Sequence, residues 1–392
     1  MNVLQVCPLL TRSPQSIGSG VPRVVYHVSK ELVRRGHDVT ICTSSSAKGS
    51  ASHEQIQNSN PAILDGIRVF YFPYSISHKL FYVTPQLVPY LKKKLDTFDV
   101  AHLHDVRCFQ SLATHHYARK SGFPYVLQLH GSYLGTINGS KLKWLLDTAI
   151  SYKVLRDSKR VIALTKTEAE YYGKKGIAAG AIDIVGNGVE FSENGGEIAK
   201  GRFREKAAIR DDQFIILYVG RIASSKGLDM LAEAFSVLKD RLGAATLVLV
   251  GQDHLGYEST LKKRVKALNI EDSTIFTGPI SESDKIDAYE DADVFVTPSF
   301  TGLPLTFLES CACGTPIVTT HNGDDIDWID GNVGYVVNYD KNDLAEAISN
   351  ILLDDRTRAE FKANCRKLAH EQFAWPSVVD KIEETYRRAV DT

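Results

Sequence analysis

Short apolar runs alternate with longer segments of helical periodicity along most of the chain. The runs are nearly continuous in Val, Ile and Leu, which is typical of strands covered on both faces of a parallel sheet. We therefore predict an α/β fold with parallel sheets. The predicted strands of the first half are 2–7, 38–43, 67–72, 99–104, 125–130 and 160–165, and those of the second half are 214–220, 246–251, 274–278, 293–298, 316–320 and 334–338.

A glycine-rich and highly charged stretch, residues 186–213, separates the two halves. A chain of 392 residues is too long for one comfortable core and fits about two domains of about 100–200 residues each. We predict an N-terminal domain over 1–189 and a C-terminal domain over 190–375. A last helix at 376–392 is expected to cross back onto the first domain. Each sheet should present the carboxyl ends of its strands, where open α/β sheets bind ligands.

Composition excludes several classes of protein. The formal net charge of −1 gives no electrostatic case for a nucleic-acid partner. No apolar run approaches the length of about 18 residues that a membrane span needs. The six cysteines form no C-x-x-C pair, which favours buried thiols in a reducing compartment over disulfides or a zinc site. The first residues lack a basic leader, so we expect a cytoplasmic protein.

Two cations follow the first predicted strand of the second half. The strand ends at Gly220, Arg221 and Lys226 lie in the loop, and a helix starts near Gly227. Cations near a helix N-terminus are locally unfavourable because they oppose the helix dipole. They become favourable if an anion binds there, held by backbone N–H groups and by both side chains. Two solvated basic residues flanking a helix are the alternative.

A lone glutamate, Glu309, lies in a short apolar helix that is predicted after the strand at 293–298. Thr306 could cap this helix, and Thr306-x-x-Glu309 then matches a capping box. Alternatively, a carboxylate at the carboxyl end of a strand could bind the vicinal hydroxyls of a ribose, and the helix N-terminus could take a phosphate. The local pattern leaves both interpretations open.

Histidines and glycines mark the carboxyl ends of strands in the first half. His130 follows a predicted strand, where a structural histidine is the alternative to a functional one. His102 and His104 lack a third ligand and make a poor metal site. Gly20 could let the backbone approach a ligand, but the dinucleotide fingerprint is incomplete and no P-loop occurs.

Residues 138–160 mix lysines and arginines with aromatic and apolar residues. This composition could form a basic amphipathic helix that lies on an anionic membrane surface. An ordinary helix with a solvated basic face explains the same pattern.

Taken in order, these motifs resemble family 4 retaining glycosyltransferases of the GT-B fold over nearly the whole chain. The family includes enzymes of bacterial and archaeal glycan and glycolipid assembly. The resemblance implies two Rossmann-like, doubly wound parallel-sheet domains that face each other across a cleft, with a nucleotide-sugar donor held mainly by the C-terminal one. The matching stretches are "GSGVPRVVYHVSKELVRRGHDVTICT", "LQLHG", "RVIALT", "IVGNGV", "LYVGRIASSKG", "LVLVG", "FTGPI", "DVFVTPS" and "LPLTFLESCACGTPIV".

The resemblance assigns roles to four side chains. Arg221 and Lys226, which follow Gly220, match the pair that binds the donor diphosphate. Glu309 matches the second glutamate of an E-x(7)-E motif and is expected to bind the donor ribose. His130 matches a histidine that contacts the donor sugar near the reacting centre. These four are the expected catalytic residues, and Gly220 is expected at the donor.

Further donor contacts are implied mainly through the backbone. Pro279 and Ile280 fall where family members contact the base. Leu305 and Thr306 fall where backbone amides meet the phosphate. Gly20 matches a glycine loop near the phosphate and the acceptor.

One departure from the family falls on Thr301. It stands eight residues before Glu309, where the first glutamate of the motif normally holds hydroxyls of the transferred sugar. Threonine is shorter and uncharged, so this donor-binding contact is altered or lost.

The expected function is retaining transfer of a sugar from a nucleotide-diphosphate sugar to a glycan, lipid-linked or small-molecule hydroxyl. No metal or other cofactor is expected, because Arg221 and Lys226 supply the positive charge. The protein would act in the cytoplasm, with a contact at the inner face of the membrane through 138–160 left open. The alternatives are a nucleotide-sugar-binding protein with impaired transfer, and a nucleotide-sugar epimerase.

Overall fold

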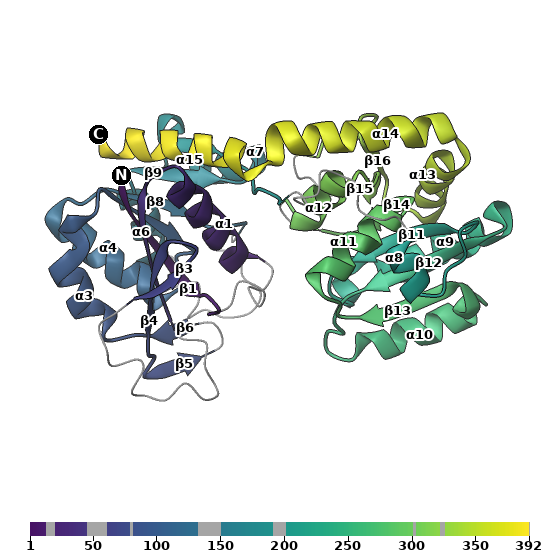
Figure 1. Ribbon diagram of the computed structural model, residues 1–392, viewed down its shortest axis with the longest axis horizontal. Helices are drawn as coiled ribbons and strands as arrows, with labels where there is room; N and C mark the ends of the chain where they lie inside the picture. Colours follow the sequence, from purple (N-terminus) through teal and green to yellow (C-terminus); the bar gives the residue numbers. More distant parts are fainter. Residues whose placement is uncertain are drawn as a thin grey trace. The chain divides into compact units, whose positions relative to one another are not determined.

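The computed structural model describes residues 1–12, 20–44, 61–78, 81–131, 150–190, 201–300, 303–321 and 326–391. The chain divides into two compact units, and each unit carries its own sheet with helices on both faces (Figure 1). The first unit comprises Met1–Asn187 and Trp375–Thr392, and the second comprises Gly188–Ala374. The second unit thus begins at Gly188, where the sequence pattern predicts residue 190.

The first unit holds an eight-stranded sheet in the order β10-β9-β8-β7-β1-β2-β4-β3. All neighbouring strands are parallel except the edge pair β3 and β4. A separate antiparallel pair is formed by β5 and β6. The strands are β1 (Asn2–Leu9), β2 (Asp38–Ser44), β3 (Ala62–Leu64), β4 (Ile67–Phe72), β5 (Ile76–His78), β6 (Phe81–Val83), β7 (Val100–His104), β8 (Tyr125–Gln128), β9 (Arg160–Ala163) and β10 (Ile182–Ile184).

Two apolar cores cover the faces of this sheet, because successive strand residues point to opposite sides. Val3 belongs to the core under α1 and α15, whereas Leu4 belongs to the core on the opposite face. The helices of the first unit are α1 (Val21–Arg34), α3 (Leu87–Lys94), η2 (Leu95–Thr97), α4 (Phe109–Ser121), α6 (Tyr152–Asp157), α7 (Lys166–Lys174), η4 (Ala179–Ala181) and α15 (Trp375–Val390).

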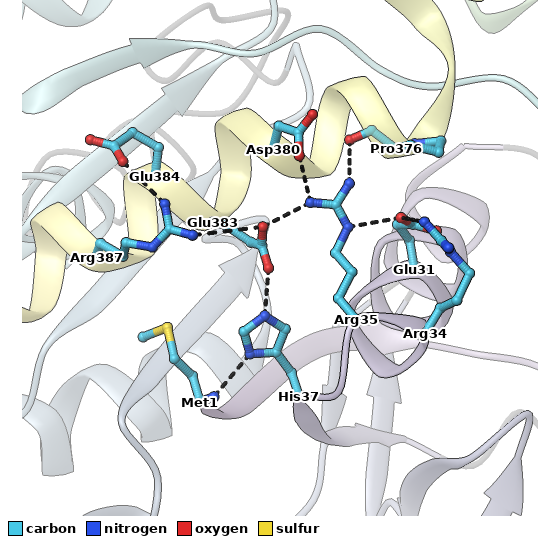
Figure 2. A network of polar contacts seen from close by, with 10 residues as sticks. All are labelled: Met1, Glu31, Arg34, Arg35, His37, Pro376, Asp380, Glu383, Glu384 and Arg387. Atoms are coloured by element: carbon cyan, nitrogen blue, oxygen red, sulfur yellow. Dashed lines mark hydrogen bonds and ion pairs between the residues drawn. The ribbon is translucent and has the colours of Figure 1, made fainter.

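The C-terminal helix α15 is joined to α1 by a polar network (Figure 2). Arg35 donates hydrogen bonds to Glu31 at 2.8 Å, to Asp380 at 2.6 Å and to Glu383 at 2.8 Å. Glu383 also lies 2.5 Å from Nε2 of His37. Apolar side chains of α15 share a buried core with those of α1. The polar network adds a second set of contacts, which holds α15 at one position along α1.

The second unit holds a six-stranded, fully parallel sheet in the order β13-β12-β11-β14-β15-β16. Its strands are β11 (Phe214–Val219), β12 (Ala245–Val250), β13 (Thr274–Gly278), β14 (Val294–Thr297), β15 (Ile317–Thr320) and β16 (Gly334–Val337). Its helices are α8 (Arg202–Lys206), η5 (Ser224–Lys226), α9 (Leu228–Leu242), α10 (Tyr257–Ala267), η6 (Glu271–Ser273), α11 (Glu282–Asp291), α12 (Leu305–Cys313), α13 (Lys341–Leu353), α14 (Asp355–Leu368) and the π-helical turn η7 (Ala369–Phe373).

The strand order reverses once in each sheet. In the second unit, the chain runs outward from β11 through β12 to β13, and then returns to β14 on the other side of β11. In the first unit, the same reversal lies between β1 and β7. The helices that follow the two switch strands of the second unit, α9 and α12, belong to opposite cores. Open α/β sheets bind ligands at such a switch point, outside the carboxyl ends of the strands.

The twelve predicted strands all occur, so the α/β prediction is confirmed. The pattern missed four short strands, β3, β5, β6 and β10, which have three residues each. No helix within the described ranges combines the length and apolarity of a membrane span. Residues 138–149, the larger part of the predicted amphipathic helix, lie outside the described residues.

Candidate functional site

The carboxyl edge of the second sheet carries a row of glycines. Gly220 follows β11, Gly251 follows β12, and Gly278 ends β13. The amide of Gly220 donates to the carbonyl of Val250 at 2.9 Å, and that of Gly251 donates to Gly278 at 3.0 Å. A Cβ atom on Gly251 would lie 1.8 Å from the carbonyl oxygen of Gly220, so only glycine fits there. We call these three residues the glycine rim, where the backbones that follow neighbouring strands approach one another closely.

The loop with the two predicted cations begins at this rim. Its residue Ile222 donates to the carbonyl of Gln252 at 2.9 Å, which ties the loop to the segment after β12. Lys226 ends the short helix η5, and Gly227 then adopts a left-handed conformation with φ 68°. A Cβ on Gly227 would lie 2.9 Å from Cβ of Pro298, which follows β14. The loop therefore lies against both strands of the switch point.

The side chains of the two cations have no hydrogen bond or ion pair in the part of the chain that the structure describes, and only the backbone carbonyl of Arg221 accepts, from the hydroxyl of Tyr218 at 2.9 Å. Arg221 is exposed and Lys226 is half-buried. Burial, followed by the nearby charge of Arg221, lowers the pKa of Lys226. Two like charges held together without a carboxylate disfavour each other. An anion bound between them would reverse that cost, so the loop has the electrostatics of an anion site.

The helix α12 opens on the other switch strand, β14. It begins at Leu305, and its N-cap is Pro304, which makes no side-chain cap. Thr306 is the second residue of the helix, so the predicted Thr306 cap and the capping box with Glu309 are wrong. Leu305 and Thr306 instead lie in the first turn, where backbone N–H groups lack partners within the helix. Thr301 lies outside the described residues.

The Glu309 side chain points to the neighbouring helix α11. Its Oε1 accepts from Nζ of Lys285 at 2.9 Å, and the hydroxyl of Tyr289 lies 3.4 Å from Oε2. The Lys285 and Glu309 side chains are only 13% and 11% exposed. This buried pair was not predicted, because its partners come from two helices and form no local motif. Lys285 also pairs with Glu282 at 2.9 Å.

The residues expected at the base precede the same helix. Pro279 is exposed and Ile280 is half-buried, and both follow the last residue of β13, Gly278. Ser281 caps α11 by accepting a hydrogen bond from the backbone of Asp284. The residues expected at the base therefore precede α11, and the residue expected at the ribose, Glu309, lies on α12, which packs against α11 through the pair of Lys285 and Glu309.

Two predicted site residues belong to the first unit. Gly20 precedes α1 with φ 86° and has open space where a Cβ would lie. His130 follows β8 in a left-handed conformation, with φ 53°. Its Nε2 lies 2.9 Å from Nδ1 of His104, a partner that the sequence pattern did not predict. Burial lowers the pKa of His130 to about 3, so the ring is neutral.

Solved structures share these two doubly wound units. A glycosyltransferase from Rickettsia africae ESF-5 aligns with a TM-score of 0.75 at 19% identity, covering 100% of this chain and 99% of that one. HepE from Anabaena, solved in complex with UDP and glucose, aligns with a TM-score of 0.72 at 17% identity, covering 99% of both chains. The protein therefore has the GT-B fold, as the resemblance predicts.

Sequence relatives give the family. The model of Glycosyltransferase Family 4 matches residues 18–193, and that of Glycosyl transferases group 1 matches 199–368. A glycosyltransferase of Methanocaldococcus jannaschii is 25% identical over 96% of both chains. A D-inositol 3-phosphate glycosyltransferase of Mycolicibacterium smegmatis is 30% identical over 61% of this chain and 55% of its own length. The chain thus carries a Glycosyltransferase Family 4 domain followed by a Glycosyl transferases group 1 domain.

Proposed function

We propose that the protein transfers a sugar, with retention, from a nucleotide-diphosphate sugar to a hydroxyl of a glycan, lipid-linked or small-molecule acceptor. The observation that carries the proposal is the cation pair at the switch point of the second unit, Arg221 and Lys226, whose side chains have no partner among the described residues. HepE shares the fold and was solved with UDP and glucose. That neighbour supports a nucleoside diphosphate as the anion, while the acceptor class rests on the resemblance alone.

The two cations act on the leaving group. Breaking the bond between sugar and diphosphate leaves negative charge on the β-phosphate, and preorganised donors that meet developing charge are usually the largest catalytic factor. Arg221 and Lys226 supply that charge without a metal ion. The amides of Leu305 and Thr306 hold the phosphate at the N-terminus of α12. On this proposal Glu309 binds the ribose.

Retention itself rests on the resemblance, and the groups available to the sugar bear only on how retention is achieved. A double displacement needs a carboxylate close to the anomeric carbon. Thr301 cannot serve as that nucleophile, and Glu309 is assigned to the ribose. We therefore favour transfer on one face of the sugar, in which the acceptor hydroxyl gives its proton to the leaving diphosphate oxygen. The role of His130 at the transferred sugar rests on the resemblance alone.

The test uses a panel of UDP-, GDP- and ADP-sugars with release of nucleoside diphosphate as the readout. Arg221→Ala and Lys226→Ala should each lower turnover about a hundredfold, the usual loss for one oxyanion-hole donor. Arg210→Ala is the matched control, because Arg210 is an exposed arginine of the same unit that pairs with Asp212 at 2.9 Å. Unchanged turnover in both loop variants would refute the proposal, and NMR of the product anomer tests retention.

The alternatives make different predictions for the same panel. A nucleotide-sugar-binding protein with impaired transfer, which Thr301 motivates, would bind donors without consuming them in the presence of any acceptor. An epimerase would change the sugar when it is incubated with donor alone. Transfer to an acceptor excludes the first alternative, and an unaltered donor excludes the second.

A further inference from the structure

Two side chains of α11 hold the carboxylate that is expected at the donor ribose. Lys285 and Tyr289 are one helical turn apart on α11, so their side chains lie on the same side of the helix. Nζ of Lys285 donates to Oε1 of Glu309 at 2.9 Å, and the hydroxyl of Tyr289 lies 3.4 Å from Oε2. Each oxygen of the Glu309 carboxylate thus faces a polar group of the neighbouring helix.

The burial of Glu309 explains why it needs the lysine. A carboxylate that is largely removed from water is costly unless a cation compensates its charge. Lys285 has a second partner, Glu282, but the Glu282 side chain is 53% exposed and water can solvate its charge. The positive charge of Lys285 therefore matters at Glu309 and much less at the surface of α11.

Tyr289 adds a donor on the other side of the carboxylate. Its side chain is fully buried. Burial, followed by the nearby charge of Glu309, raises the pKa of Tyr289 well above its ordinary value. The hydroxyl therefore keeps its proton, and a carboxylate can only accept it.

These contacts decide the orientation of the carboxylate. The last torsion of a glutamate side chain is broad, so a carboxylate without fixed donors turns between orientations. Lys285 on one oxygen and Tyr289 near the other restrict that rotation. A carboxylate can accept about four hydrogen bonds, so both contacts are compatible with further bonds to a ribose. The vicinal hydroxyls of a ribose need two acceptors in one plane, and the plane is what α11 sets.

We propose that Lys285 is a positioning residue for Glu309: it compensates the buried charge of the carboxylate and fixes its plane, so that both oxygens can accept from the vicinal hydroxyls of the donor ribose. The ribose contact rests on the proposed function. Lys285 itself does not touch the ligand. Removal of Lys285 should therefore weaken only ligands that carry a ribose, and only while Glu309 is present.

The first test measures the affinities of Lys285→Met by calorimetry for UDP, GDP and ADP, for their 2′-deoxy counterparts and for inorganic pyrophosphate. Methionine is also long and unbranched, so it can fill the space of the lysine stem without its charge. The affinity for the nucleoside diphosphate that binds best should fall about tenfold, the loss expected when a charged hydrogen-bonding group is misplaced. The preference over the 2′-deoxy ligand should shrink, and the affinity for pyrophosphate should not change.

Lys206→Met is the matched control. Lys206 also pairs with α11, through Asp284 and Asp287, but it is exposed and has no contact with Glu309 in the described part of the chain. Its removal should leave all the affinities unchanged. Lys285→Arg keeps a cation on a different head group and should restore part of the preference for ribose.

The second test asks whether Lys285 acts through Glu309. In a Glu309→Gln background, Lys285→Met should cause little further loss of affinity for the nucleoside diphosphate, because residues that act through one contact are not additive. A further loss of about tenfold in that background, as large as that of a charged hydrogen bond, would mean that Lys285 binds the ligand itself and would contradict the proposal.

Lys285→Gln removes the charge but keeps a donor, so it carries the test if Lys285→Met does not fold. The preference for ribose should then shrink by a smaller factor. Equal weakening of pyrophosphate and nucleoside diphosphate, or an unchanged preference over the 2′-deoxy ligand, would overturn the proposal. Absence of any nucleoside diphosphate binding in the unchanged chain would refute the proposed function as well, whereas a ribose preference that survives the loss of the lysine would refute this inference alone.

Discussion

In the first unit, polar side chains near the carboxyl end of the sheet bind one another; in the second, two cations at the matching end bind nothing within the described part of the chain. Both sheets have the same reversal of strand order at this end. Burial lowers the pKa of His102 and of His130 to about 3 and that of His104 well below its ordinary value, which keeps these three rings neutral. The topology is therefore shared, and the chemistry differs.

The difference shows which edge gains from a charged ligand. A neutral cluster whose members hydrogen-bond to one another offers no net charge to an ion. Two cations without a partner of opposite charge gain attraction and hydrogen bonds when an anion binds. Function thus depends on the residues that each edge carries and not on the fold that the two units share.

The largest expected effect on stability comes from adding a side chain to the glycine rim. In Gly251→Ala the new Cβ would lie 1.8 Å from a backbone oxygen, and backbone cannot move aside as a flexible side chain can. We expect the free energy of unfolding to fall by more than about 4 kcal/mol, measured by chemical denaturation. The matched control is Gly256→Ala, where φ is also positive but the space is open, at a cost of about 1–2 kcal/mol. An equal decrease in the free energy of unfolding in the two variants would show that there is room for a Cβ at Gly251.

Acid should affect the first unit more than the second. Unfolded histidine has a pKa of about 6.5, and His102 in the folded chain has a pKa of about 3. Between these values the unfolded chain binds more protons, so the free energy of unfolding decreases as the pH falls, by about 1.4 kcal/mol per pH unit for each such histidine. The described histidines with a lowered pKa, His102, His104 and His130, all belong to the first unit.

His102→Phe removes one of these titrations, so its loss of stability between pH 6.5 and 5.5 should be about 1 kcal/mol smaller than that of the unchanged chain, because the unfolded histidine is already half protonated at pH 6.5. Denaturant midpoints at the two pH values give this difference. An identical pH dependence in both proteins would mean that His102 is protonated in the folded state.

The Glu309 carboxylate tests whether the second edge recognises a nucleoside or only phosphate. Glu309→Gln should weaken binding of a nucleoside diphosphate about tenfold, since a hydrogen bond to a charged group contributes about 1.5 kcal/mol or more. Binding of inorganic pyrophosphate should not change, because that ligand lacks a ribose. Calorimetric titration of both ligands gives the comparison, with Glu282→Gln as the control that also pairs with Lys285. Equal weakening for both ligands would assign Glu309 to the Lys285 pair alone.

Hydrophobic periodicity predicted the strands that have four or more residues, because a continuous apolar run is visible without knowledge of its neighbours. The edge strands β3 and β10 and the pair β5 and β6 have three residues each, which leaves no pattern to detect. The reversal between β11 and β14 also could not be derived from periodicity, since strand order depends on tertiary pairing.

The parts of the candidate site whose residues are neighbours in the sequence were predicted. The cations of the β11 loop follow their strand directly, and their side chains have no partner in the ranges that the structure describes. The capping box failed because α12 begins at Leu305, one residue before Thr306, and because Glu309 finds its partner on another helix. The contact between His104 and His130 needs β7 beside β8. Alternating polar positions in both strands were the only sequence signal for it.

The smallest expected effect concerns the mutual influence of the two cations. An anion binds best while Lys226 is protonated, and burial together with Arg221 lowers the pKa of that ammonium group. The affinity for a nucleoside diphosphate should therefore fall several-fold as the pH rises through this lowered pKa. In Arg221→Ala the like charge is gone, so the pKa of Lys226 rises and the fall in affinity moves to higher pH, although the affinity at neutral pH is weaker.

Lys226→Arg separates this titration from other effects of alkali. Arginine keeps its charge throughout the accessible pH range. The affinity of the variant for nucleoside diphosphate should therefore no longer fall over the pH range in which Lys226 of the unchanged chain loses its proton. Calorimetric titrations of all three proteins over the same pH range give the comparison. A fall at the same pH in the unchanged chain and in Arg221→Ala would mean that the two charges do not act on each other, and the second edge would then hold two separate cations and no joint anion site.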